Sequence, residues 1–386
     1  MRQKFEKRWF SGMLVAGLLA AAVTSGSPAQ TDEGPGGLPV KKGGFYLTEY
    51  AAQEVARLQP PGQGQAGGEA AGGQGNPSQE TRSNTIVAGQ SGSRRGQGPS
   101  ENVDIVTEGE KGGFPQDPIL GGATLTMFHS QGESQMLSAM LQTRQGSLIV
   151  VDGGLGGDGE YLRSQIQAKG GHVAAWLITH PHGDHVGALY RILQDEAAGI
   201  QSGIQIDGIY YSFAAPEWYT VHDPSEQTMA HAIIGTFSGL PEGMLHTVGK
   251  GQAIQVDDVT VQVMNDRYEL SSDKGNNAGI VYKLTVNGKS ILFLGDMGED
   301  GGKRLLADAG AEALKSDIVQ MAHHGQNGVG EEVYQAINPS ICLWPSPDWL
   351  WNNAGNRYRI SETKGWMSRL NVQRHYCTKD GDQVIQ

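Results

Sequence analysis

The densest chemistry in the sequence lies at residues 179–187, which read Thr-His-Pro-His-Gly-Asp-His-Val-Gly. Three imidazoles and one carboxylate fall within six residues, as His180, His182, Asp184 and His185. Neutral imidazole and carboxylate groups are ligands of Zn²⁺, Mn²⁺ or Fe²⁺. The spacing predicts that His180 and His182 converge on one cation from a tight loop, whereas Asp184 and His185 can reach a second cation.

Further polar side chains follow apolar runs elsewhere in the chain. Asp152 follows the run Ser-Leu-Ile-Val-Val, and Asp296 follows Ile-Leu-Phe-Leu-Gly. The pair His323-His324 follows Ile-Val-Gln-Met-Ala. Apolar runs of this length indicate buried strands, and ligands in layered α/β folds collect where strands end. We therefore expect these groups to meet the histidine-rich loop at one edge of a sheet.

The order of these groups resembles the metallo-β-lactamase fold superfamily. H-x-H-x-D-H is similar to its signature, and Val-Asp-Gly-Gly, Phe-Leu-Gly-Asp and His-His-Gly follow in the family's order. The stretches NNAGIVYKLTVNGKSILFLGD and LKSDIVQMAHHGQNG look like the ComEC-type branch, the hydrolase domain of bacterial competence proteins. Secreted phosphorylcholine esterase is similar as well. The resemblance covers residues 123–386 and implies an αββα sandwich with metals at one edge.

The resemblance also implies roles for the matching side chains. The metal ligands would be His180 and His182 for the first metal, Asp184 and His185 for the second, Asp296 as the bridge, and one of His323 and His324. The sequence leaves open which of these two histidines binds metal. The other would be a proton donor or a hydrogen-bonding partner of a ligand. Asp152 would orient the histidine loop, since outer carboxylates fix imidazole tautomers.

One position departs from the superfamily pattern. Many members carry another histidine about 20 residues before the bridging aspartate, where this chain has Asn276 and Asn277, as ComEC-like members do. An oxygen of Asn277, a water molecule or His222 would then complete the first site. The cofactor is therefore expected to be one or two Zn²⁺ ions, with Mn²⁺ as the alternative.

The ligand set implies hydrolysis by a metal-activated hydroxide. Asp184 would accept a proton, and His323 or His324 would stabilise charge on the leaving oxygen. The favoured activity is that of a phosphodiesterase. The alternatives are an acyl hydrolase of the lactonase or β-lactamase type, and a non-catalytic, metal-stabilised surface module. The net charge of −12 disfavours strong binding of long nucleic acids. We expect a small-molecule or cell-surface ester as the substrate.

The remaining chain divides into three parts. Residues 1–29 carry a basic start, an apolar stretch and a small-residue site typical of a signal peptide. Export would make the protein secreted or extracellular, either free or associated with the cell surface, and cleavage would leave no transmembrane segment. An uncleaved anchor is the alternative. Residues 30–118 are rich in Gly, Gln and Ser, which predicts a disordered, flexible linker with one short helix at 44–59. Residues 119–386 would form the α/β hydrolase domain.

Secondary structure follows from periodicity. Strands are expected at 123–129, 136–143, 147–151, 173–179, 204–213, 254–264, 278–286 and 290–294, and helices at 160–169, 187–196 and 301–314. Two aromatic-rich loops, at 210–219 and 344–351, either pack as core or form a wall for a sugar, a base or a quaternary ammonium group. Cys342 and Cys377 would be a disulfide or two buried thiols.

Overall fold

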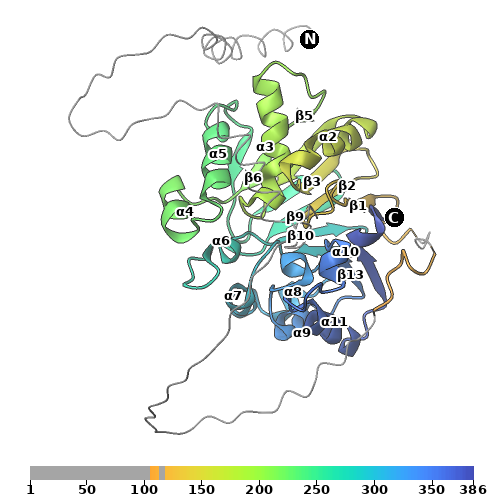
Figure 1. Ribbon diagram of the computed structural model, residues 1–386. Helices are drawn as coiled ribbons and strands as arrows, with labels where there is room; N and C mark the ends of the chain where they lie inside the picture. The colour runs from red at the N-terminus through yellow and green to blue at the C-terminus, as the bar shows by residue number, and fades with distance from the viewer. Residues whose placement is uncertain (1–104, 113–117) are drawn as a thin grey trace, which may run out of the picture.

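The computed structural model describes residues 105–112 and 118–386. The predicted signal peptide and the predicted helix at 44–59 lie outside the described residues. Two sheets face each other across the domain (Figure 1). In the described part of the chain, no helix is both long enough and apolar enough to span a bilayer.

The first sheet contains eight strands in the order β15-β1-β2-β3-β4-β6-β7, with β5 paired to β4. Its antiparallel half joins β15, β1, β2 and β3, and its parallel half joins β3, β4, β6 and β7. The bounds are β1 (Thr124–Met127), β2 (Ser138–Gln142), β3 (Leu148–Asp152), β4 (His172–Leu177), β5 (Gln205–Ile206), β6 (Ile209–Tyr211), β7 (Leu245–Thr247) and β15 (Gln383–Ile385).

The second sheet contains seven strands in the order β14-β13-β12-β11-β10-β9-β8. Strands β11 to β14 are parallel to one another, and β8 to β11 are antiparallel. The bounds are β8 (Ala253–Val256), β9 (Val259–Val263), β10 (Tyr282–Val286), β11 (Lys289–Phe293), β12 (Ile318–Gln320), β13 (Ile341–Trp344) and β14 (Arg374–Cys377).

Helices cover the outer face of each sheet. The first half of the domain contributes η1 (Gly156–Asp158), α2 (Gly159–Ala168), α3 (Gly183–Ala197), α4 (Pro216–His222), α5 (Gln227–Phe237) and α6 (Lys274–Asn277). The second half contributes α7 (Glu299–Ala309), α8 (Ala311–Leu314), η2 (Ala322–Gly325), α9 (Glu331–Ile337), α10 (Asp348–Trp351), α11 (Ile360–Arg369) and η3 (Thr378–Asp380).

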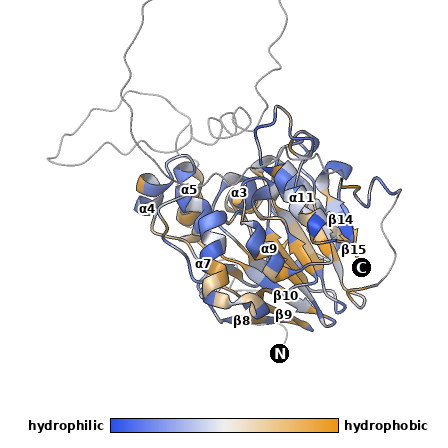
Figure 2. Cartoon of the chain, turned by 90° about the horizontal axis from the view of Figure 1, so that it is seen from below, coloured by the Kyte–Doolittle hydropathy of each residue, from blue (hydrophilic) through white to orange (hydrophobic). Residues whose placement is uncertain are grey.

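The alternation of side chains along each strand produces three apolar layers. Ile149 and Val151 of β3 pack between the sheets with residues of the facing sheet such as Leu284. Val150 points the other way and packs under α2, α3 and α5. A third cluster lies between the second sheet and α7, α9 and α11. Figure 2 shows the hydrophobic strands in the interior and hydrophilic surfaces on the covering helices. The layers are those of the predicted αββα sandwich.

Several predicted elements differ in their bounds. The expected strand at 254–264 is a hairpin of β8 and β9, because the chain turns at Asp257, which has a φ of 52°. The expected helix at 301–314 is broken into α7 and α8 at Gly310, where φ is 79°. Helix α3 starts at Gly183 instead of Gly187. This earlier start places part of the histidine motif in the first turn of a helix.

Residues 105–112 contact the domain, although the sequence analysis assigned them to the linker. The Glu108 amide donates to the carbonyl oxygen of His375 at 2.8 Å, and Thr107 Oγ1 donates to Asp380 at 2.5 Å.

Both cysteines are buried free thiols: Cys342 Sγ contacts Met367, and Cys377 is on the edge strand β14. The disulfide alternative is therefore not what the structure contains.

Candidate metal centre

The histidine motif lies between strand β4 and helix α3. The chain leaves β4 at Leu177, passes through an extended His182 with φ −81° and ψ 155°, and enters α3 at Gly183. The amide of His185 donates back to the carbonyl oxygen of His182, which closes the turn. This geometry aims Asp184 and His185 from the first helical turn towards the second sheet.

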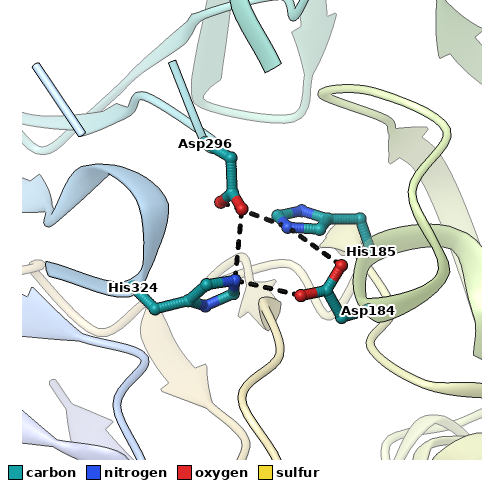
Figure 3. Close-up of side chains that lie close together, drawn as sticks. All are labelled: Asp184, His185, Asp296 and His324. Carbon is teal, nitrogen blue, oxygen red and sulfur yellow. Dashed lines mark ion pairs between the residues drawn. The ribbon is translucent and has the colours of Figure 1, made fainter. Parts of the chain in front are cut away.

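Four side chains from three separate segments converge there (Figure 3). Asp184, His185, Asp296 and His324 are all buried, and each offers one ligand atom within 4.8 Å of the other three. His324 Nε2 lies 3.2 Å from Oδ2 of Asp184 and 3.2 Å from Oδ2 of Asp296. His185 Nε2 lies 3.1 Å from Oδ1 of Asp296. We call these four residues the Asp/His cluster. It lies where strands of both sheets end.

The residues present fit a metal cation. Nε2 of His185, Nε2 of His324 and Oδ1 of Asp296 are buried and make no hydrogen bond in the described structure. Unpaired buried polar atoms cost free energy. Two carboxylates and two imidazoles within reach of one point are the ligand set that Zn²⁺ or Mn²⁺ takes in proteins. A cation among them would satisfy all of these atoms together.

The electrostatics of the Asp/His cluster favour ionised carboxylates. Burial alone would raise the pKa of Asp296, but His185 and His324 hold that pKa well below its ordinary value. The pKa of Asp184 is likewise lowered, because His185 and His324 outweigh the effect of burial. In turn, Asp296 and Asp184 overcome burial and raise the pKa of His324 to about 9. The two carboxylates are therefore ionised before any cation binds.

Asp152 orients His185. Its Oδ2 lies 2.7 Å from Nδ1 of His185, and Thr179 donates its amide and its hydroxyl to the two carboxylate oxygens, each at 2.7 Å. With Nδ1 held by Asp152, Nε2 of His185 is the nitrogen that faces Asp296. The backbone of Asp152 has a φ of 56°, a left-handed conformation that bends the chain at the end of β3. The predicted orienting contact of Asp152 is present in the structure.

His180 and His182 lie beside the Asp/His cluster and are not among its four residues. The His180 ring is 4.1 Å from that of His185 and 4.3 Å from that of His182, measured between ring centroids. Nε2 of His180 is buried without a hydrogen bond, while Nδ1 lies 3.0 Å from Thr179 Oγ1. Burial and the two neighbouring histidines lower the pKa of His180 well below its ordinary value. His180 is thus held in the neutral form that binds metals.

The structure distinguishes the two histidines that the sequence left open. Both have left-handed backbones, with φ of 50° at His323 and 55° at His324. This turn sends His324 into the Asp/His cluster with a fully buried side chain. His323 stays at the edge, with 19% of its side chain exposed and its Nε2 3.7 Å from Oδ2 of Asp296. The geometry makes His324 the ligand candidate and His323 the proton-donor candidate.

Asn277 and His222 are directed elsewhere. Oδ1 of Asn277 accepts the amides of Gly298 and Gly301 at 3.0 Å each, and so holds the start of α7. Nδ1 of His222 lies 3.1 Å from Nζ of Lys274. Neither side chain belongs to the Asp/His cluster.

Two contacts of the motif had no sequence signal. Gln135 Nε2 donates to Oδ2 of Asp184 at 3.3 Å, and its own oxygen accepts from Gln326 at 2.9 Å. Asp223 Oδ2 lies 2.7 Å from Nε2 of His182. These residues are far from the motif in sequence and belong to no recognisable pattern, so only the folded chain reveals them.

The aromatic loops are mostly core. Trp344 and Trp351 are buried and pack edge to face with centroids 5.3 Å apart. Tyr219 is buried as well, and its hydroxyl accepts the amide of Ala214. Trp349 is only partly buried, and it donates to the carbonyl oxygen of Glu133. The packing interpretation therefore applies to Tyr219, Trp344 and Trp351.

Part of the sequence matches a known protein family, and the fold is similar to that of solved structures. Residues 135–252, which include the histidine motif, match the family model described as the metallo-beta-lactamase superfamily. No curated protein matches the sequence. Among solved structures, the metallo-beta-lactamase fold protein YhfI from Bacillus subtilis aligns at 10% identity and a TM-score of 0.41, over 68% of this chain and 98% of its own.

Two further structures are similar at the same level. A diphosphatase of the PhnP family aligns at 14% identity and a TM-score of 0.37, over 68% of this chain and 97% of its own. The diiron beta-hydroxylase CmlA from Streptomyces venezuelae aligns at 12% identity and a TM-score of 0.43, over 68% of this chain and 54% of its own. Residues 135–252 of this α/β protein, which carry Asp184 and His185 of the buried Asp/His cluster, thus resemble the metallo-beta-lactamase superfamily in sequence.

Proposed function

We propose that this protein is a metal-dependent hydrolase and that its substrate is a phosphodiester. The observation that carries the proposal is the Asp/His cluster, four buried ligand atoms within 4.8 Å of one another, three of which make no hydrogen bond. Buried polar atoms in a cluster that served only to stabilise the fold would be hydrogen-bonded. His185 Nε2 and Asp296 Oδ1 instead face each other at 3.1 Å without forming a hydrogen bond. This arrangement supports a bound cation, for which Zn²⁺ and Mn²⁺ are the candidates.

The cluster would hold one cation, and His180 with His182 would hold a second beside it. When bound, such cations lower the pKa of water and stabilise negative charge on a leaving oxygen. Gln135 holds Oδ2 of Asp184 by a hydrogen bond. His323 is partly exposed, its Nδ1 makes no hydrogen bond, and it borders Asp296. These features support His323 as the group that gives a proton to a leaving oxygen.

The substrate class rests on three features of the chain. The resemblance to the ComEC-type branch favours phosphodiester over acyl substrates. The missing third histidine, where Asn276 stands, separates the chain from the pattern of many superfamily members. The net charge of −12 favours small phosphodiesters or cell-surface esters over long nucleic acids, because polyanions are repelled by acidic surfaces.

The test is hydrolysis of bis-(p-nitrophenyl) phosphate by the full chain, metal-free and with Zn²⁺ or Mn²⁺. The expected result is metal-dependent turnover that Asp296→Asn abolishes. The matched control is Asp207→Asn, which changes a carboxylate that lies 2.7 Å from an exposed histidine, His172. Turnover of nitrocefin or a lactone without phosphodiester cleavage would refute the proposed phosphodiesterase activity and favour an acyl hydrolase. Bound metal without any turnover would favour a non-catalytic module.

A second variant tests the proton donor. His323→Gln should lower kcat and leave the bound metal unchanged, because His323 lies outside the four-residue cluster. A leaving group that needs no proton, such as p-nitrophenolate, should suffer less than an alkoxide leaving group. Equal losses on both substrates would contradict the assigned role of His323.

We further propose that the protein is exported and acts outside the cytoplasm, on the basis of residues 1–29 alone. The measurement is amino-terminal sequencing of the protein recovered from the medium or the cell surface after expression with its own leader. A new amino terminus near residue 30 is expected. Retention of the leader on a cytoplasmic product would contradict the proposal.

A further inference from the structure

His182 makes a contact that the histidine motif does not predict. Its Nε2 lies 2.7 Å from Oδ2 of Asp223, a residue 41 positions further along the chain. Both side chains are about nine-tenths buried, with 11% of each exposed. Asp223 follows the last residue of α4, and its amide and carbonyl oxygen are bonded to Tyr219 and Glu226, so its position is fixed by the turn between α4 and α5.

A third segment closes over this pair. A side chain at Gly275, in helix α6, would collide with Oδ2 of Asp223 and would lie 2.6 Å from Nε2 of His182. The backbone of α6 therefore covers the bonded nitrogen of His182. Substrate and solvent cannot approach Nε2 from that side, because the glycine backbone is packed against the Asp223–His182 pair.

We infer that Asp223 is the positioning residue of His182, holding its Nε2 so that Nδ1 is the nitrogen presented to a cation beside the Asp/His cluster. A neutral imidazole has one donor nitrogen and one acceptor nitrogen. Asp223 accepts from Nε2, so the lone pair available for metal is on Nδ1. This inference rests on the proposed function, since it requires that the site binds cations.

The neighbouring histidines His185 and His180 are also held by a polar side chain, but through Nδ1 instead of Nε2. His185 is bonded at Nδ1 to Asp152, and His180 lies at hydrogen-bond distance from Thr179 through Nδ1. Both therefore present Nε2. A histidine that presents Nδ1 holds the ion closer to its own backbone than one that presents Nε2, so His182 can bind a cation that lies near the turn preceding α3. Outer carboxylates of this kind typically change metal affinity 10–100-fold when removed.

The experiment measures metal binding by the full chain rather than activity. Bound Zn²⁺ per chain and its affinity are determined by mass spectrometry and by competition with a chromophoric chelator, for the wild type, Asp223→Ala and Asp223→Asn. We expect two cations in the wild type. Asp223→Ala should weaken one of them 10–100-fold and leave the other unchanged. Asp223→Asn should restore most of the affinity, because the amide oxygen still accepts from Nε2.

The control is Asp207→Ala. Asp207 lies 2.7 Å from Nε2 of His172, the same distance as in the Asp223–His182 pair. Unlike that pair, the side chains of Asp207 and His172 are both exposed. Its removal should change neither cation. A nitrogen-detected NMR spectrum of the Zn²⁺-loaded wild type, labelled at histidine, should show the proton of His182 on Nε2. The position of this proton reports how the His182 ring is held, which a purely structural role of Asp223 would not determine.

Each outcome decides the inference. Unchanged affinities in Asp223→Ala overturn it. Equal weakening in Asp223→Ala and Asp223→Asn also overturns it, because the charge would then matter and Asp223 would be a ligand. One cation in the wild type, bound by the Asp/His cluster, overturns this inference but leaves the proposed function intact. A wild-type chain that binds no cation refutes the proposed function itself.

Discussion

Metal binding by the Asp/His cluster should depend steeply on pH. Asp296 and Asp184 raise the pKa of His324 to about 9 against the opposing effect of burial. The pKa of His185 is raised well above its ordinary value, as Asp296, Asp152 and Asp184 overcome burial. In the metal-free protein at pH 7 both rings are therefore protonated. A cation binds only the neutral ring, so binding must release these protons and affinity must rise with pH.

The magnitude follows from the pKa of His324. At pH 7, two pH units below 9, about 1% of the His324 rings are neutral, which costs about 3 kcal/mol of binding free energy. Displacing this proton makes the affinity rise about tenfold between pH 7 and pH 8. The raised pKa of His185 adds to this rise in the same direction. Histidines with an ordinary pKa of 6.5 would instead give an almost flat affinity over this range.

The assay is competition with a chromophoric chelator of known proton affinity at pH 6.5, 7.0, 7.5 and 8.0. Calorimetry in two buffers of different ionisation enthalpy counts the released protons independently. The control is His172→Gln, which removes an exposed imidazole at the start of β4 and should leave the slope unchanged. An affinity that changes less than about threefold between pH 7 and pH 8, with no proton release, would refute this reasoning.

Three further predictions can be checked separately. Gly275→Ala should reproduce the metal-binding defect of Asp223→Ala without changing either bonded partner, because its Cβ would collide with Asp223; normal metal content in this variant would contradict the packing argument. Asp152→Ala should weaken metal binding about 10–100-fold, because it releases His185. Asp152→Asn should weaken metal binding less, because asparagine keeps a hydrogen-bond acceptor and tolerates the φ of 56° at this position. Chelator competition measures the affinity of both variants. Burial and Lys111 lower the pKa of His375 to about 4, so its protonation favours the unfolded state, and stability should be constant above pH 6.5 and fall by about 3 kcal/mol towards pH 4. Urea unfolding of the wild type and His375→Gln measures this fall, and an equal pH dependence in both proteins would exclude His375 as its source.

The histidine motif was predictable because its spacing is local. Asp184 and His185 are adjacent, and a helix that starts at Gly183 carries both on its first turn. Asp296 and the pair His323-His324 were predictable as ends of apolar strands, since strand ends gather at one edge of such folds. The sequence therefore predicts which segments meet in the Asp/His cluster and the two-sheet fold around it.

The choice between His323 and His324 was not predictable. Adjacent residues on a regular strand point to opposite faces, but both histidines have left-handed backbones. Which ring enters the cluster depends on contacts outside the motif, such as the bond from Ser346 Oγ to the carbonyl oxygen of His324. Backbone strain of this kind leaves no mark in residue type.

Asp223 was missed for a related reason. Its partner His182 precedes it by 41 residues, and the turn that holds Asp223 is defined by α4 and α5 together. From the sequence, only the neighbouring His222 was predicted, as one candidate to complete the first metal site. Only the fold places the carboxylate of Asp223, and not the imidazole of His222, against the motif.

The metal content of the full chain tests the central claim most directly. After loading with Zn²⁺ and dialysis, the wild type and the variants Asp296→Asn and His324→Gln would be analysed by mass spectrometry, with circular dichroism to confirm folding. The account predicts at least one tightly bound cation in the wild type and its loss in both folded variants. Equal metal content in all three proteins, or no metal in the wild type, would contradict it.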